Sequence, residues 1–481
     1  MIEQKEDYRT YVTIQADKAC IEGVLCKIFL PKRLTEPIEL YLCPNEEQRC
    51  KLDGIFEFSM VGEVKGFSGK VEAKILSDKV YFKHKSSNHW GNEIVESVFI
   101  AEPIDLKVIQ FLRHDSQDSL KKTVGSFWLT PSALLSPAKT IEPSYNGNVK
   151  VETIRQIKFT LANALPLVFD KHFRYLKNEN GDDITFTELV AEFEIGGEKQ
   201  DIEADTIGCL DDFLMLVSFA AKHRCVCLGW NFINFEGHTK YFRRNLSIPD
   251  IRKKPSLLDV IIDIQDFEEF IKQTYTKFIE IEPKDLIRQA IQCIISVNQE
   301  NKTFENAFFT LYSALESLTL HFRRINQLEE ILPPEQWTNL ENELKKWIKN
   351  HQLLNNDKNK DKRAFIYEKL PELNRISFLT VFTQFCNYYS VDLSDLWPVI
   401  KNSKGISLSE IRNKLIHGET FNSLQLEALT IAKEHLQWIV ERLILAVLGW
   451  PISRSYINQD YLSHYMACYK DWEKYQKTLS V

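Results

Sequence analysis

Residues 307–318 read AFFTLYSALESL, and their apolar side chains recur at three- and four-residue steps. This spacing is typical of an amphipathic α-helix that buries one face. The segment before it carries a second stripe of the same kind, formed by Leu286, Ala290, Ile291, Ile294 and Ile295. Helices of this type bury their apolar faces against one another. The pattern therefore predicts an all-α helical bundle, which we assign to residues 281–481.

Two later segments extend the predicted bundle. Pro333-Pro334 opens a helix that carries apolar residues at helical spacing, namely Trp337, Leu340, Leu344 and Trp347. A second helix is expected over residues 424–448, after a cap formed by Asn422 and Ser423. Because its later part is apolar on much of its circumference, we expect it to be buried in the bundle.

The last segment of the chain is rich in aromatic residues. Its side chains at positions Tyr461, Tyr465, Tyr469, Trp472 and Tyr475 are four, four, three and three residues apart. They are therefore expected on one face of a helix. Packing in the core or at an interface is the favoured role, and stacking of nucleic-acid bases is the alternative.

The first part of the chain has a different pattern. Short apolar or alternating runs rich in Val, Ile, Phe and Tyr occur at residues 23–30, 38–42, 55–61, 80–83, 106–112 and 124–129. These runs favour β-strands in a sandwich or a curled antiparallel sheet. We therefore expect a β-rich domain over residues 1–145, and the fold class of the whole chain is predicted to be α+β.

A loop rich in Pro, Ser, Asn and Gly, residues 136–148, predicts a domain boundary. The segment after it, residues 146–280, has mixed signals, and it is predicted to be either a second α+β segment packed with the first domain or an extension of that domain. A turn at 178–183 indicates a β-hairpin. The pattern further predicts a helix, a strand and an amphipathic helix in that order, over residues 210–221, 226–235 and 266–279.

Composition limits the function classes. The 481 residues are 44% apolar and 26% charged, which is typical of a folded globular protein. The net charge of −7 excludes a chain that coats nucleic acid with its whole surface, so a contact with RNA must be local. Residues 345–363 hold seven basic and two acidic side chains. We expect this run to be a solvated polar loop, and guidance of RNA phosphates is the alternative.

Targeting signals are not evident in the sequence. The N-terminus lacks an apolar leader, and no stretch reaches the roughly 18 apolar residues that span a bilayer. The chain is therefore expected to be cytoplasmic, with no membrane partner. The ten cysteines have irregular spacing, and buried reduced thiols are the favoured interpretation. A zinc site made of Cys20, Cys26, Cys43 and Cys50 remains an alternative.

The stretch that carries chemistry is RNKLIHG, residues 412–418. It places Arg412, Asn413 and His417 within two turns of a predicted helix. Five residues turn a straight helix by about 140°, so the Arg412 and His417 side chains converge only where the helix ends or distorts. Gly418 predicts such an end, because glycine adopts the left-handed backbone that follows a helix. His417 is expected in the last turn, beside exposed carbonyl groups that favour a protonated imidazole.

These residue types suit RNA cleavage without a metal. Histidine acts as an acid or a base near neutral pH, and the planar, always charged guanidinium of Arg412 matches phosphate oxygens. Asn413 is expected to orient His417 or to hold a phosphate oxygen. The opposite interpretation is structural: Arg412 pairs with Glu316 or Glu419, and His417 merely occupies a helix end. Signatures of ATP-binding loops, zinc proteases and serine hydrolases are absent, so no cofactor and no metal is expected.

The chain resembles the HEPN superfamily, whose RNase members carry Arg, a polar residue and, a few residues later, His. The helix with Ala-Leu-Glu at 314–316 resembles the first long HEPN helix. Residues 127–132 (FWLTPS), 210–214 (LDDFL) and 218–220 (SFA) are similar to the N-terminal region of ApeA-type anti-phage proteins. The resemblance covers both halves of the chain, through short phrases.

This resemblance implies a metal-independent endoribonuclease with Arg412, His417 and Asn413 as catalytic residues and Glu316 in support. It implies an RNA substrate, with tRNA as one candidate, and a homodimer or higher assembly in which two motifs face each other. It further implies abortive anti-phage defence that halts translation, a phage-derived trigger, and an N-terminal region that senses or regulates. The alternative is a non-catalytic HEPN-like dimerisation and interaction protein.

Overall fold

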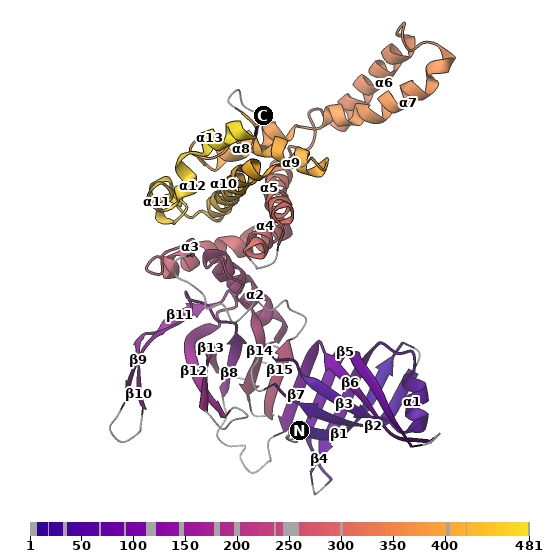
Figure 1. The fold of residues 1–481 in the computed structure, drawn as a ribbon, viewed down its shortest axis with the longest axis vertical. Coiled ribbons are helices and arrows are strands. Elements are labelled where there is room, and N and C mark those ends of the chain that lie inside the picture. The colour runs from indigo at the N-terminus through magenta and orange to yellow at the C-terminus, as the bar shows by residue number, and fades with distance from the viewer. Residues whose placement is uncertain are drawn as a thin grey trace. The chain divides into compact units, whose positions relative to one another are not determined.

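The computed structural model describes residues 7–17, 19–31, 36–66, 69–90, 93–111, 122–143, 149–177, 183–196, 203–234, 237–243, 259–298, 302–400, 405–419 and 421–479. The chain divides into two compact units, Met1–Asp259 and Val260–Val481 (Figure 1). The first is rich in β-strands and the second is helical, which confirms the predicted α+β class.

The first unit begins with a closed β-barrel. Its strands are β1 (Tyr8–Ala16), β2 (Ala19–Phe29), β3 (Glu39–Cys43), β4 (Glu57–Lys65), β5 (Val71–Trp90) and β6 (Glu93–Pro103), with α1 (Glu46–Leu52) after β3. They run antiparallel in the order β5-β4-β1-β2-β3-β6, and pairing of β6 with β5 closes the ring. Alternate residues such as Val12 and Ile14 are fully buried in the barrel core. The expected curled antiparallel sheet is thereby confirmed.

The sheet continues beyond the barrel through β7 (Asp105–Phe111), which also pairs with β5. The following order is β15 (Gly237–Arg243), β14 (Cys227–Ile233), β8 (Lys122–Leu129), β13 (Asp183–Gly196), β12 (Pro166–Lys177) and β11 (Ile157–Thr160). The short strands β9 (Ala138–Pro143) and β10 (Val149–Arg155) form a separate pair. The predicted strands are confirmed, and pairing of β12 with β13 confirms the hairpin, while residues 178–182 of its predicted turn lie outside the described part.

The predicted boundary near residue 145 is wrong. Strand β8, which precedes the loop at 136–148, lies between β13 and β14, which follow it. One hydrogen-bonded sheet therefore joins both sides of the loop, of which residues 144–148 fall outside the described part. Helix α2 (Glu203–Ala220) packs onto this sheet through Phe213, whose ring lies 5.2 Å from Phe159 and 5.7 Å from Phe169.

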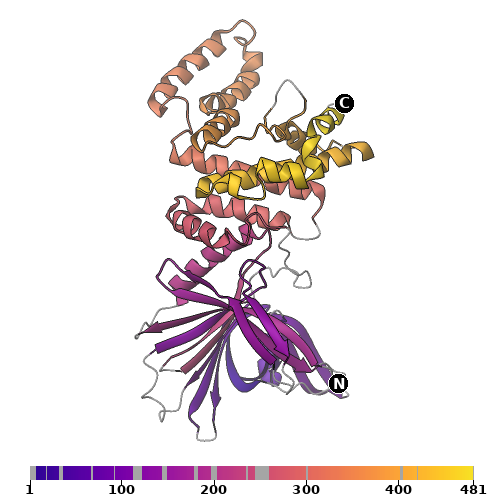
Figure 2. The ribbon, with the colours of Figure 1, turned by 90° about the vertical axis from the view of Figure 1, so that its left-hand side faces the viewer.

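The second unit is a helical bundle (Figure 2). It contains α3 (Phe267–Glu280), α4 (Lys284–Val297), α5 (Phe304–Ile325), α8 (Phe378–Tyr388), α9 (Leu408–Ile416) and α10 (Ser423–Leu448). The predicted buried helix corresponds to α10, and Asn422 caps it by accepting a hydrogen bond from the Gln425 backbone. Helix α5 packs against α4 and α10, so the stretch at 307–318 lies at the centre of the bundle.

Helix α3 belongs to the bundle, so the predicted boundary at residue 280 moves to residue 259. The C-terminal part of the chain holds α3 in place. Phe270 contacts Trp450 edge to face at 5.4 Å, and the Arg454 guanidinium lies 2.7 Å from the Glu269 carboxylate. The sequence predicted that α3 is amphipathic. It did not predict that the helix packs against Trp450, which is almost two hundred residues away in the chain.

A helical arm interrupts the bundle between α5 and α8 (Figure 1). It consists of α6 (Pro334–Asn350), the 3₁₀ turn η2 (Asp357–Asn359), α7 (Lys360–Lys369) and the 3₁₀ turn η3 (Leu370–Asn374). The run at 345–363, which was expected to be a solvated polar loop, is therefore mostly helical. Backbone bridging of Glu330 with Arg375 joins the two ends of the arm. The Asn374 amide strengthens this closure by accepting from the Leu332 N–H at 2.8 Å and donating to its carbonyl at 3.0 Å.

The single aromatic face predicted for the C-terminal segment is wrong. A 3₁₀ turn, η4 (Ile452–Arg454), leads to three short helices, α11 (Gln459–Tyr465), α12 (Ala467–Lys470) and α13 (Trp472–Thr478). Tyr469 is buried, whereas Tyr465 is 71% exposed. In the described part of the chain, no single helix is long and apolar enough to cross a membrane. One pair of segments, Gln425–Leu448 and Ile452–Tyr465, reaches that length and apolar composition only when taken together, and the chain bends by 112° between them.

Candidate active site

Helix α9 presents the Arg-Asn-x-x-x-His segment. A capping box defines its beginning: the Ser407 hydroxyl accepts from the Glu410 N–H at 3.3 Å, and the Glu410 carboxylate accepts from the Ser407 N–H at 2.9 Å. Leu408 and Ile411 are fully buried and face the bundle. Since these residues anchor the first turn, the later residues of the helix are left toward the surface.

The end of α9 is a Schellman motif. Gly418 has a φ of 73°, and its N–H donates to the Leu415 carbonyl at 3.1 Å. The N–H of Glu419 donates to the Lys414 carbonyl, also at 3.1 Å. The predicted helix end at Gly418 is thereby confirmed. His417 is the C-cap residue, one position beyond the last turn in which it was expected.

Arg412 meets helix α5. Its guanidinium lies 5.5 Å from the centre of the Tyr312 ring and 3.4 Å from the Glu316 carboxylate. It also donates to the Asn413 side-chain oxygen at 3.3 Å. Tyr312 and Glu316 are one helical turn apart on α5, so they form one surface for the cation. The Arg412 side chain remains 34% exposed, which leaves it accessible to an anionic ligand.

Tyr312 is not suited to act as a base at this site. Burial raises the pKa of Tyr312 to about 12, and the Glu316 carboxylate adds to the increase, although Arg412 acts in the opposite sense. The phenol is therefore protonated at neutral pH. Its ring supports the guanidinium through a cation–π contact.

His417 is exposed at the helix end. Its backbone N–H donates to the Asn413 carbonyl at 3.0 Å. Within the described residues, the imidazole has no hydrogen bond, ion pair or ring contact, and the Asn413 amide makes no hydrogen bond to it. The structure therefore brings Arg412, Asn413 and Glu316 together and places His417 at the C-terminal end of the same helix α9, with its ring open to solvent.

The surroundings of the motif are not basic. Arg412 faces Glu316, and Lys414 lies 3.6 Å from the Glu419 carboxylate. These two cations and two anions cancel. The structural interpretation of Arg412 expected an ion pair with Glu316 or Glu419, and the structure contains the pair with Glu316. A polyanionic ligand at this site gains little attraction from the local charge.

The ten cysteines, all of which lie among the described residues, form no disulfide bond, and they differ in exposure. Cys26, Cys225 and Cys227 are buried, Cys20 and Cys50 are exposed, and the other five are half-buried, so the expectation of buried thiols is confirmed for three of the ten. Burial raises the pKa of the Cys225 thiol to about 12, which makes it unreactive. Among the described residues no group of three or more His, Cys, Asp or Glu side chains is arranged to hold a metal.

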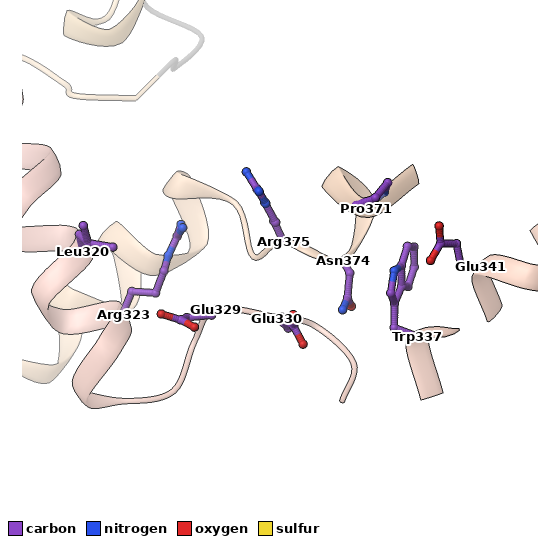
Figure 3. A pocket seen from close by; sticks show the side chains of 9 residues that line it. All are labelled: Leu320, Arg323, Glu329, Glu330, Trp337, Glu341, Pro371, Asn374 and Arg375. Carbon is purple, nitrogen blue, oxygen red and sulfur yellow. The ribbon is translucent and has the colours of Figure 1, made fainter. Parts of the chain in front are cut away.

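A pocket of about 560 Å³ lies at the base of the arm, away from residues 412–418. Figure 3 shows Arg323 and Glu329 at one side of it and Trp337 and Glu341 at the other. Arg323 donates to the Ile376 carbonyl at 3.0 Å and so helps to join the ends of the arm. Sequence patterns did not predict this pocket, because its lining comes from segments that are distant in the chain.

A buried polar cluster lies under α10, and the sequence analysis also missed it. Arg442 donates to both carboxylate oxygens of Asp395, at 2.6 and 2.7 Å, and the Tyr469 hydroxyl donates to the same carboxylate at 2.6 Å. Burial acts to raise the pKa of Asp395, but the hydrogen bonds from Arg442 and Tyr469 outweigh it and the pKa is lowered. In the sequence, the only signal for this cluster is the position of Arg442 within the apolar helix α10.

His435 belongs to the same region and is fully buried. Its Nδ1 accepts from the backbone N–H of Trp397 at 3.1 Å, so Nε2 carries the proton and faces the Cys468 carbonyl at 3.4 Å. Burial lowers the pKa of His435 to about 4, although the Cys468 carbonyl and the Asp395 carboxylate oppose this shift. The buried imidazole is therefore neutral.

The helical unit is expected to lose stability in mild acid. An unfolded histidine titrates near pH 6.5, so below that pH the unfolded chain binds a proton that the folded chain does not. The free energy of unfolding should fall by about 3 kcal/mol between the unfolded pKa and the folded value of about 4. Urea unfolding followed by helical circular dichroism at several pH values measures this loss.

The matched control is His464→Gln, at an exposed histidine of α11. His435→Gln should reduce the pH dependence above the range in which carboxylates titrate, and His464→Gln should leave it unchanged. Some dependence should remain in His435→Gln, because burial also lowers the pKa of His321 in α5. Equal pH dependence in wild type and His435→Gln would show that the buried imidazole is not its source.

Comparison of the chain with protein-family models, with curated proteins and with solved structures gives no match in any of the three.

Proposed function

We propose that this chain is a metal-independent endoribonuclease of the HEPN type, with Arg412, Asn413 and His417 at its active site. The observation that supports this most is the arrangement at α9, in which one short helix carries an accessible guanidinium at its middle and an exposed imidazole at its C-cap. Glu316 and Tyr312 hold the guanidinium from α5. A helix end without chemistry has no need for this combination.

The proposed reaction is transfer of the phosphate within the RNA strand. A base takes the proton of the 2′-hydroxyl, whose oxygen then forms a bond to phosphorus. The bond from phosphorus to the 5′-oxygen breaks, and an acid gives that oxygen a proton. The products are a 2′,3′-cyclic phosphate, which can open to a 3′ phosphate, and a 5′-hydroxyl. Arg412 would stabilise the extra negative charge on the phosphorane.

His417 is the single histidine of the proposed active site, and one imidazole cannot be base and acid in the same step. We therefore propose a homodimer in which two α9 helices face one RNA strand across a two-fold axis, so that one His417 acts as base and the other as acid. The exposure of His417, which has no intramolecular partner in the described part of the chain, is compatible with this arrangement.

The cellular role that we propose is abortive anti-phage defence. Cleavage of RNA, with tRNA as a candidate, would halt translation in the infected cell. The unit Met1–Asp259 would sense a phage-derived trigger or restrain the nuclease. This part of the proposal rests on the ApeA-like sequence phrases.

RNA from cells tests the proposal. Total RNA is isolated after induced expression, with and without phage infection, and new ends are mapped. The proposal expects fragments with 5′-hydroxyl ends, and purified protein should form the same ends in the presence of a chelator. Intact RNA in infected cells that express the chain would contradict it.

The alternative is a non-catalytic interaction protein. The Arg412–Glu316 contact favours it specifically, because an ion pair between α9 and α5 also has a structural use. This alternative expects Arg412→Ala to weaken folding, whereas the nuclease proposal expects a folded, inactive protein.

A further inference from the structure

An RNA ligand needs a basic surface that the region around residues 412–418 does not provide. The chain carries a net charge of −7, and the cations beside His417 are balanced by Glu316 and Glu419. Since phosphate contacts dominate the affinity for nucleic acids, a second surface must supply positive charge. The strongest candidate is the outer part of the helical arm, residues 346–365, which holds six basic and two acidic side chains.

The arm is exposed to an unusual degree for two packed helices. Helix α7 has no buried residue, and Ile348 is the one residue of α6 that is buried. A helix pair with so little core contributes little to the stability of the bundle. Because the bridge of Glu330 with Arg375 closes its base, the pair stands out as a defined element (Figure 1).

The cations of the arm fall into two groups. Two of the seven basic residues at 345–363 have structural partners: Lys345 pairs with Glu341 at 2.7 Å, and Arg363 donates to the carbonyls of Leu354 and Asn356. The other five have no carboxylate partner among the side chains that the structure describes, namely Lys346, Lys349, Lys358, Lys360 and Lys362. These five charges are available to a ligand.

Aromatic side chains lie among these lysines. Trp347 is 64% exposed and contacts only the His351 ring, at 5.0 Å, among the described aromatic pairs. Phe365 is 66% exposed and lies one helical turn from Lys362 on α7. Single-stranded nucleic acids bind to exposed rings that lie beside lysines, since bases stack on the rings and phosphates contact the charges.

We propose that the outer part of the arm, residues 346–365, is a docking surface for single-stranded RNA that is distinct from the site of cleavage. The identification of the polyanion as RNA rests on the proposed ribonuclease function. A second copy of the chain fits this surface less well, because a two-fold contact between two arms would bring together ten lysines that have no carboxylate partner among the described side chains.

Binding is tested with full-length His417→Ala protein, which separates docking from cleavage, and a fluorescent single-stranded RNA in chelator. Lys346→Gln with Lys349→Gln should weaken binding and lower the salt slope, in log–log form, by about 1.4, because each lysine contributes about 0.7. Trp347→Ala with Phe365→Ala should weaken binding about ten-fold or more. The matched control is Lys470→Gln with Lys477→Gln, two exposed lysines outside the arm.

Cleavage by the same arm variants in the active protein gives a second readout. It should slow at low RNA concentration and recover at saturating RNA, because the arm raises affinity and leaves the chemical step unchanged. RNA binding without any cleavage would contradict the proposed nuclease but support the arm.

Three results would overturn the inference. The first is equal RNA binding by the arm variants and the control. The second is a change of oligomeric state in the Trp347→Ala and Phe365→Ala variant, which would mark a protein interface. The third is competition by polyglutamate as strong as that by unlabelled RNA, which would mark a site for acidic proteins.

Discussion

Substitution of His417 by alanine is expected to abolish RNA fragmentation and growth arrest while the protein remains folded. The imidazole is exposed and has no partner in the described part of the chain, so its removal costs no packing. If it carries the proton transfers, the cleavage rate should fall by about 10²-fold or more. The measurement is the appearance of 5′-hydroxyl ends in total RNA, together with growth after induction.

The control for this prediction is His464→Ala, which removes another exposed histidine from the same unit. It should cleave RNA as the wild type does. Arg412→Lys adds a finer comparison, because lysine keeps the charge but loses the planar fork that binds two phosphate oxygens. Full toxicity of both His417→Ala and Arg412→Ala would rule out the proposed active site.

Loss of Arg442 is expected to destabilise the helical unit by about 3–5 kcal/mol. The Arg442 side chain is 3% exposed and that of Asp395 is 10% exposed, so Arg442→Ala leaves a carboxylate without its cation in the interior. The Tyr469 hydroxyl alone cannot replace two charge-assisted hydrogen bonds. Urea unfolding at neutral pH, followed by helical circular dichroism, measures the effect.

The double variant Arg442→Met with Asp395→Leu is the matched test of the cause. If the cost comes from the unpaired charge, removing both partners should restore much of the lost stability, since apolar replacements of buried ion pairs are often nearly neutral. A double variant as unstable as Arg442→Ala would instead assign the loss to packing or to the Ile457 carbonyl, which also accepts from Arg442 at 2.9 Å.

Local patterns in the sequence were sufficient for most elements. Apolar spacing predicted α5, α6 and α10, and short apolar or alternating runs predicted strands such as β2, β4, β7 and β8, because both periods reflect which face of one element is buried. Strands such as β1, β6 and β15 were not predicted. The sequence also predicted where α9 ends and where α10 begins. Gly418 and Asn422 act on backbone groups within a few residues of themselves, so their effect needs no knowledge of the rest of the fold.

Tertiary structure decided what depends on partners far away in the chain. Closure of the barrel by β5 and β6, the insertion of β8 between β13 and β14, and the packing of α3 against Trp450 all join segments that no local period connects. The same limit applies to side chains. Composition located the basic run at 345–363, but only the folded arm separates Lys345 and Arg363, which have structural partners, from five lysines that remain available.

The candidate site shows both contributions. The order of Arg412, Asn413 and His417 along one short helix, and the helix end beside His417, follow from the sequence itself. The contact of Arg412 with Glu316, 96 residues earlier, depends on how α9 packs on α5, since a residue type specifies what a side chain can bind but not what the fold brings to it.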